Sequence, residues 1–370
     1  MKKRLSYFDM AKGAGMILVL IGHLQGEILG FSPYILYLCI WIFSFHMPFF
    51  FIVSGMLMRY GNDTEKDLKE LVKKRFKGIM VPYYWFSLIY IGIVLYSLFI
   101  DKVVPVSTLL VNIWYVIGLY GMNVLWFLPA LFMGELLFLF IKKKFDNKVS
   151  IAVIIAAAVI AYVLNLLLRS QSFDTPLAER FHELAITLLR PVFACSFIAI
   201  GYYGFAFIEK LKAESFSFKE VLLAFALLAL NISCIVISMR VLHYNNVGEF
   251  RSLVHNNVIV YYAAAISGSL WLIIFCKNLS MLKYKFPLLT FYGINSLVFM
   301  AVHNNSKVLT FALRSAMYVN QYLTRARGYI CYGIVVLTML VYTTLVILLI
   351  NRFFPFLTGR GSKVRQDKKK

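Results

Sequence analysis

The chain has 370 residues, of which 61% are hydrophobic, and its mean hydropathy is +0.77. These values exclude a soluble globular domain and predict an all-α polytopic membrane protein. The net charge of +21 could indicate a nucleic-acid partner, but we expect none because the basic residues follow a membrane topology. Five scattered cysteines without a CxxC pair predict neither a disulfide framework nor a zinc site.

The first hydrophobic segment opens with two charged residues and carries a histidine deep inside. Lys12 and His23 are eleven residues apart, which is three helical turns plus about 20°, so they share one helix face. Asp9 lies on the same face, one turn earlier. At a rise of ~1.5 Å per residue, His23 lies ~21 Å beyond Asp9, at or past the middle of a ~30 Å hydrocarbon layer. We therefore expect a polar stripe that runs from one membrane surface to the middle.

Long apolar runs continue along the chain almost without interruption. Those of about 17 to 25 residues predict ten transmembrane helices. A shorter, Gly-interrupted stretch at 104–121 is expected to be interfacial or re-entrant. The first run has a basic flank but no small-residue cleavage site, so we expect a retained span. The predicted spans are 10–29, 35–58, 79–99, 123–141, 150–168, 188–208, 219–239, 257–276, 287–305 and 329–350.

The distribution of positive charge predicts the orientation. With ten spans and an inside amino terminus, 28 of the 38 basic residues fall on cytoplasmic segments and ten on outer ones. Eleven spans would put the basic loops at 142–148 and 277–285 outside. We therefore predict a multi-pass protein of the cell membrane with both termini cytoplasmic. A single membrane domain over 1–354 is followed by a basic tail, 355–370, expected to touch anionic lipid.

Few ionisable side chains lie inside the predicted spans, and such groups indicate function by default. They are His23, His46, Glu135 and His303, with Arg190 near an outer end. The first four are expected between the midplane and the outer third of the membrane. Hydrogen-bonding ties between helices are an alternative for His46 and His303, and Glu135 could hold a histidine or an arginine. No helix carries an HxxxH pair, so we predict no metal site.

Five motifs lie along the chain in a characteristic order. They are Arg4, Asp9, Lys12 and His23; Phe45-His46-Met47-Pro48 with Ser54-Gly55; Lys74-Arg75-Phe76-Lys77 before Pro82-Tyr83; Leu125-Trp126-Phe127-Leu128-Pro129-Ala130 with Glu135; and Tyr292-Gly293-Ile294-Asn295-Ser296-Leu297 with His303. Together they resemble the acyltransferase-3 membrane proteins, specifically the branch of fucose 4-O-acetylase-like and surface-polysaccharide O-acetyltransferases. Family members usually have Arg at the position of Lys12 and a further basic residue at that of Gly78.

This resemblance implies transfer of an acyl group, usually acetyl, from cytoplasmic acyl-CoA to a hydroxyl of a glycan or glycolipid at or beyond the outer face. Acetyl-CoA is then a co-substrate, and no cofactor is bound permanently. Lys12, Arg75 and Lys77 are expected to bind its phosphates by charge-assisted hydrogen bonds. Ordinary positive-inside anchoring is an equal alternative for Arg75 and Lys77.

The histidines are the expected catalytic groups. Neutral His23 could act as the general base that deprotonates the acceptor hydroxyl. His46 or His303 could donate to the developing oxyanion or orient His23. A covalent acyl-histidine and direct transfer both stay open. Asp9 is too far from the ring to orient it, so we expect it to pair with Arg4 or Lys12.

The acceptor is expected at the outer face. Trp126, Arg190 and the loop at 241–256 combine aromatic, cationic and amide groups of the kind that bind sugars. Membrane-interface belts contain the same residue types.

Two other functions are compatible with parts of the pattern. A secondary transporter or exporter of glycan units also has a midplane cluster of titratable groups, but the two related halves common in carriers are not detected. A membrane-bound O-acyltransferase of the unrelated histidine-dependent type is disfavoured because the histidine lies so early, in the first span.

Overall fold

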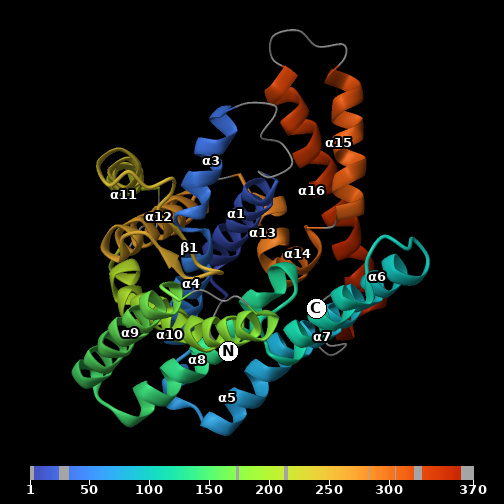
Figure 1. Cartoon of the computed structure of the whole chain (residues 1–370). Helices are drawn as coiled ribbons and strands as arrows, with labels where there is room; N and C mark the ends of the chain where they lie inside the picture. The colour runs from blue at the N-terminus through green and yellow to red at the C-terminus, as the bar shows by residue number, and fades with distance from the viewer. Residues whose placement is uncertain are drawn as a thin grey trace. The chain divides into compact units, whose positions relative to one another are not determined.

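The computed structural model describes residues 4–24, 33–171, 175–211, 216–282, 284–304, 306–320 and 327–359, which are almost wholly helical (Figure 1). This confirms the predicted all-α class. The α-helices are α1 (Ser6–His23), α3 (Pro33–Phe43), α4 (His46–Tyr60), α5 (Leu68–Arg75), α6 (Val81–Phe99), α7 (Val106–Ile117), α8 (Phe127–Lys144), α9 (Asn147–Arg169), α10 (Pro176–Lys210), α11 (Phe218–Val236), α12 (Val258–Leu279), α13 (Pro287–Ile294), α14 (Ser296–Val302), α15 (Ser306–Asn320) and α16 (Arg327–Phe353).

Short elements of other kinds connect these helices. Strands β1 (Gly248–Glu249) and β2 (Val254–His255) pair antiparallel, with Gly248 opposite His255. The short 3-10 and π segments are η1 (Asp63–Glu65), η2 (Phe76–Met80), η3 (Asn123–Trp126), η4 (Ile237–Val241) and η5 (Pro355–Thr358).

Within the described residues, 8 helical segments are long and apolar enough to cross a membrane, which confirms a polytopic membrane protein. Each coincides with one of the predicted spans. The predicted span at 10–29 is represented by α1 up to His23, and 25–32 lie outside the described residues. At 12 residues, α7 reaches only about 18 Å, too short for the hydrocarbon layer.

The structure differs from the single span predicted at 287–305. Two short helices, α13 and α14, lie there instead, and they meet at Asn295, whose φ of −103° and ψ of 19° are not helical. The Asn295 amide donates to the Phe291 carbonyl at 2.9 Å, and its Oδ1 accepts from Asn351 at 2.9 Å. The Phe291 carbonyl also accepts from the Asn295 backbone N–H at 3.1 Å, so the side-chain amide shares this acceptor where α13 ends.

The chain forms two compact units. Unit 1 is drawn from 1–50, 206–250 and 254–351, and unit 2 from 51–205, 251–253 and 352–370. Of the predicted tail at 355–370, η5 and Gly359 are described and the remainder is outside the described residues.

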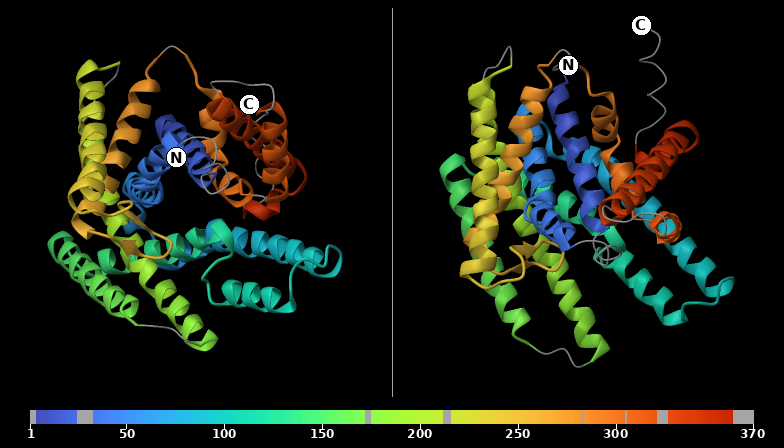
Figure 2. Two further views of the ribbon diagram at one scale, coloured as in Figure 1. Left: turned by 45° about the horizontal axis from the view of Figure 1, so that its top comes forward. Right: turned by 90° about the horizontal axis from the view of Figure 1, so that it is seen from above.

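Unit 1 is built around α1. This helix packs against α3, α12 and α13 and lies between the last two (Figure 2). Two glycines let the backbones approach closely: Gly13 faces the carbonyl of Leu289, and Gly293 faces the carbonyl of Asp9. A Cβ at either position would overlap that oxygen, so small residues are required at this crossing.

Polar side chains tie α11 to α12 within unit 1. Asn231 of α11 donates to the Ala264 carbonyl at 2.8 Å and to the Ser44 hydroxyl at 3.0 Å. Near the other end of α12, Lys277 lies 3.0 Å from Glu220 of α11, and both side chains are buried. The buried charges are therefore paired, as burial requires.

Unit 2 contains a second close crossing, between α4 and α10. Gly55 faces the Ile198 carbonyl, and Gly201 faces that of Ile52. On the neighbouring helix α8, Gly134 contacts Ala194. These small residues hold α4, α8 and α10 close enough for side chains to bond across them.

Candidate active site

Three histidines of unit 1 lie together at the end of α1. His23 is the last residue of α1, His46 is the first of α4, and His303 follows α14 directly. The His23 ring centroid lies 5.3 Å from that of His303 and 6.3 Å from that of His46. The structure thus brings together three of the predicted catalytic residues, with His23 in contact with both others.

Local sequence explains how His46 reaches this place. Helix α3 ends at Phe43, and the Ser44 hydroxyl donates to the Trp41 carbonyl at 2.7 Å, which closes the turn. Helix α4 then begins at His46, with Pro48 in its first turn, where the missing N–H breaks no helical bond. The His-Met-Pro sequence therefore places an imidazole at a helix start.

Backbone carbonyls fix the tautomers of two of the rings. His46 Nδ1 lies 3.2 Å from the Ile42 oxygen, and His303 Nδ1 lies 2.8 Å from that of Met300. Since a carbonyl only accepts, each Nδ1 carries the proton and each neutral ring keeps a lone pair on Nε2. The exposed fractions are 6% for His46 and 1% for His303.

His303 has an unused acceptor. Its Nε2 is buried and has no hydrogen-bond partner among the described residues. A buried acceptor without a donor is unfavourable by about 1–3 kcal/mol, so a donor supplied by a neighbour or a substrate would be stabilised there.

Phe43 adjoins two of the histidines. Its ring centroid lies 4.8 Å from that of His46 and 5.9 Å from that of His23, nearly perpendicular to both. The apolar ring thus closes one side of the cluster.

The charged end of α1 forms an ion-pair group. Asp9 is buried, and its carboxylate lies 2.5 Å from Arg4 Nε and 3.0 Å from Lys12 Nζ. The hydrogen bond to Asp9 raises the pKa of Arg4 above its ordinary value, so this pair stays ionised. Asp9 therefore pairs with both cations, and the unbroken helix α1 keeps the stripe from Lys12 to His23 on one face.

Glu135, predicted as a catalytic group, lies in unit 2 among other partners. Ser54 donates to its Oε1, and Arg75 Nε lies 3.2 Å from its Oε2. Arg75 also donates to Asp63 Oδ2 at 2.5 Å. Of the two partners considered for Glu135, these contacts favour an arginine.

Sequence reasoning missed Asp63. It is buried, and its carboxylate also binds Lys66 at 2.5 Å. The segment between Arg59 and Lys77 holds four acidic residues, Asp63, Glu65, Asp67 and Glu70, so its sequence does not single out Asp63.

The predicted phosphate-binding cations differ in their surroundings. Lys12 is held by Asp9, and its side chain is 20% exposed. Arg75 is held by two carboxylates and is 21% exposed, whereas Lys77 of η2 is exposed. Lys12 belongs to unit 1, and Arg75 and Lys77 belong to unit 2.

Arg190 and Trp126, predicted to bind the acceptor, contact each other inside unit 2. Arg190 is 1% exposed and donates to the carbonyls of Arg251 at 2.7 Å and Tyr120 at 2.9 Å. Its guanidinium lies 4.4 Å from the Tyr120 ring centroid and 5.4 Å from that of Trp126. These contacts favour a packing role, and acceptor binding by either residue stays a prediction.

In the part of the chain that the structure describes, no group of three or more His, Cys, Asp or Glu residues is arranged to hold a metal ion. All five cysteines are buried.

Comparison with known proteins identifies the family. Residues 5–352 match the acyltransferase-3 family model, described as an acyltransferase domain. No curated protein and no solved structure shows a significant match to the chain. The matched segment covers nearly the whole chain and contains all three clustered histidines. The chain therefore belongs to the acyltransferase-3 family and is a multi-pass membrane acyltransferase.

Proposed function

We propose that this acyltransferase moves an acetyl group from cytoplasmic acetyl-CoA to a hydroxyl of a cell-envelope glycan or glycolipid, in the cell membrane. The observation that carries the proposal is the cluster of three imidazoles at the end of α1. Such a cluster supplies the acid–base chemistry that transfer to an alcohol needs, and the family match supplies the reaction class.

His23 is proposed as the general base. It is the histidine that contacts both others, and it is only partly buried, so a substrate can reach it. It accepts the proton of the acceptor hydroxyl as the oxygen attacks the acetyl carbonyl carbon. The carbon–sulfur bond then breaks, and the proton passes to the departing thiolate, which leaves an ester and the CoA thiol.

Either His46 or His303 is proposed to orient His23, because the neutral His23 ring has a single N–H to donate. In their neutral forms both rings present an acceptor at Nε2, because each Nδ1 donates to a carbonyl. An acceptor fixes the tautomer of a neighbouring imidazole that donates to it, which leaves the other nitrogen of that ring basic. The contacts therefore favour orientation of His23 over donation to an oxyanion.

Basic residues of the sequence motifs are proposed to bind the acetyl-CoA phosphates. In unit 1, Lys12 has the required charge. In unit 2, Arg75 and Lys77 have the required charge, and Asp63 and Glu135 hold the Arg75 guanidinium in place. The proposed role of Glu135 is thus to position Arg75.

Envelope glycans of cells with and without this protein test the proposal. Mass spectrometry should find an alkali-labile mass difference of one acetyl group on a surface glycan only when the protein is present. Identical glycans in the two strains would refute acetyl transfer to the envelope.

A further inference from the structure

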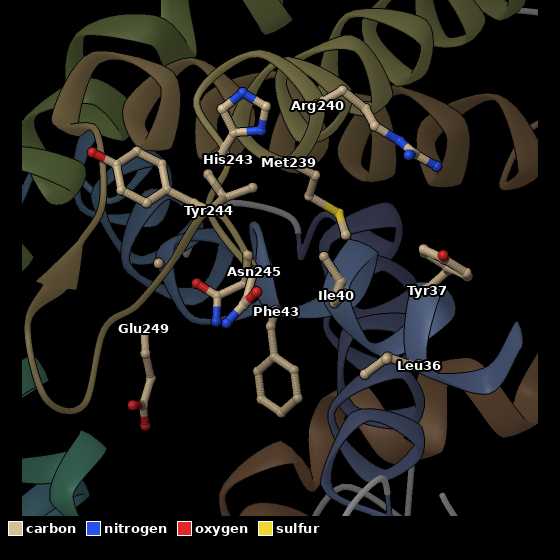
Figure 3. Close-up of a pocket in the computed structure, with 13 residues that line it drawn as sticks. Leu36, Tyr37, Ile40, Phe43, Met239, Arg240, His243, Tyr244, Asn245 and Glu249 are labelled. Atoms are coloured by element: carbon tan, nitrogen blue, oxygen red, sulfur yellow. The ribbon is translucent and has the colours of Figure 1, made fainter. Parts of the chain in front are cut away.

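Unit 1 contains a cavity that the proposed chemistry does not yet use. Its volume is about 690 Å³, within the usual range for small-molecule sites. Helix α3 lines one part of it, and η4 with the following segment up to β1 lines the remainder (Figure 3).

One residue of the cavity wall also belongs to the histidine cluster. Phe43 lines the cavity, and the same ring contacts His46 and His23. A molecule bound in the cavity is therefore separated from the imidazoles by a single aromatic ring.

The remainder of the lining combines several kinds of polar group with aromatic rings. Arg240, His243 and Asn245 are exposed, and their side chains make no hydrogen bond or ion pair within the described ranges. Tyr37 and Tyr244 add rings that are 53% and 39% exposed. Amide, imidazole and guanidinium groups beside aromatic surfaces suit a polyhydroxylated ring, whose faces are apolar and whose edges carry hydroxyls.

The part of the lining that runs from η4 to β1 is held in place by its own hydrogen bonds before any ligand binds. The Ser238 hydroxyl and the Asn256 amide each donate to the Asn246 carbonyl at 2.8 Å. The Tyr244 N–H donates to the Ser238 carbonyl at 3.0 Å, and β1 pairs with β2 just beyond. A preorganised loop binds a ligand with less loss of conformational freedom.

The charge pattern does not suit acyl-CoA. Among the described residues that line the cavity, Arg240 is the one arginine or lysine, and Glu249 lines the same cavity. Several phosphates would require more than one cation.

We propose that this cavity binds the saccharide acceptor, and that Phe43 is a positioning residue that determines which sugar hydroxyl reaches the histidines. This inference rests on the proposed function, because it takes the acetyl group to be transferred at the histidine cluster. It assigns acceptor binding to unit 1, to α3 and part of the loop predicted at 241–256, rather than to Trp126 and Arg190.

Kinetics of the full-length protein in lipid nanodiscs test the binding role. The acceptor probe is surface glycan stripped of its esters with alkali, and release of the CoA thiol reports the rate. Asn245→Ala should raise the KM for glycan about tenfold and leave the KM for acetyl-CoA unchanged. Gln171→Ala, an exposed amide outside the cavity, is the matched control and should behave as the wild type. An unchanged glycan KM in Asn245→Ala would count against the site.

A specificity measurement tests Phe43 separately. Phe43→Leu shortens the wall without adding charge, so the acetyl group should move to a different hydroxyl of the same sugar, as mapped by NMR of the product. A purely structural role would lower the amount of product but leave its position unchanged, and that result would overturn the assignment of Phe43.

Protection from labelling tests binding without catalysis. Since all five native cysteines are buried, Asn245→Cys should give a single accessible thiol, and stripped glycan should protect it from maleimide. Gln171→Cys should be labelled equally with and without glycan. Protection without acetyl transfer by the wild type would refute the proposed function alone. Transfer by the wild type with neither protection nor a KM effect would refute the acceptor site alone.

Discussion

At the scale of single residues, the chemistry depends on which nitrogen of each imidazole is available. His303 illustrates this, because its Nδ1 donates to Met300 while its Nε2 is buried and unpaired among the described residues. An asparagine can reproduce the donor at Nδ1, and a glutamine can place an acceptor near Nε2.

The pair His303→Asn and His303→Gln therefore separates positioning from packing. We expect His303→Asn to lower kcat by about tenfold or more, because it removes the unpaired Nε2 acceptor proposed to orient His23 during the reaction, and His303→Gln to restore part of the rate. Steady-state acetyl transfer with purified protein is the measurement. Equal rates in the two variants would contradict a positioning role for Nε2.

The carboxylate pair around Arg75 makes a stability prediction. Asp63→Asn weakens the 2.5 Å contact with Arg75 and should destabilise the protein by about 1–3 kcal/mol, because a buried charged partner is lost. Lys66→Gln is the control. The Lys66 side chain also pairs with Asp63 but is 45% exposed, so this ion pair should contribute less than about 1 kcal/mol to stability. The measurement is the apparent melting temperature of each variant in detergent. A larger decrease for Lys66→Gln would contradict the network.

The sequence predicts which residues carry the chemistry better than it predicts which residues contact one another. The spacing of Lys12 and His23 places both on one face of α1 because helical periodicity fixes that relation. His46 and His303 approach His23 because the ends of three separate helices meet. Helical periodicity within one segment cannot predict such a meeting. Asp63 was missed for the same reason, because its buried state depends on Arg75, twelve residues later.

At the scale of helices, the crossing of α1 and α13 should tolerate no side chain. Gly293→Ala would place a Cβ against the Asp9 carbonyl, and we expect a loss of about 1–3 kcal/mol or failure to fold. Gly333→Ala on α16 is the control, because nothing lies within 4 Å of its Cβ position. Yield of monodisperse protein and apparent melting temperature are the readouts. A normal yield of Gly293→Ala would contradict the close crossing.

Hydropathy predicted the long helices well and failed where a polar residue interrupts an apolar run. The stretch at 287–305 is as apolar as a span, yet it divides at Asn295, which is bonded to Phe291 and Asn351. An average over some 19 residues cannot detect one amide that finds partners in the fold.

At the scale of the whole molecule, the charge asymmetry predicts sidedness. Helix α9 gives a direct test, because Asn147 and Gln171 lie at its two ends, and both are exposed. On intact cells, an impermeant maleimide should label Gln171→Cys and should label Asn147→Cys only after permeabilisation. The reverse pattern would contradict cytoplasmic termini.

The central claim is that the imidazole at the end of α1 performs the proton transfer of the acyltransferase reaction. The most direct test is the rate of acetyl transfer from acetyl-CoA to ester-stripped surface glycan by purified His23→Ala, with the amount of folded protein matched to the wild type. We predict a decrease of about 10²–10⁴-fold, the usual contribution of a general base. A rate equal to that of the wild type would contradict the account.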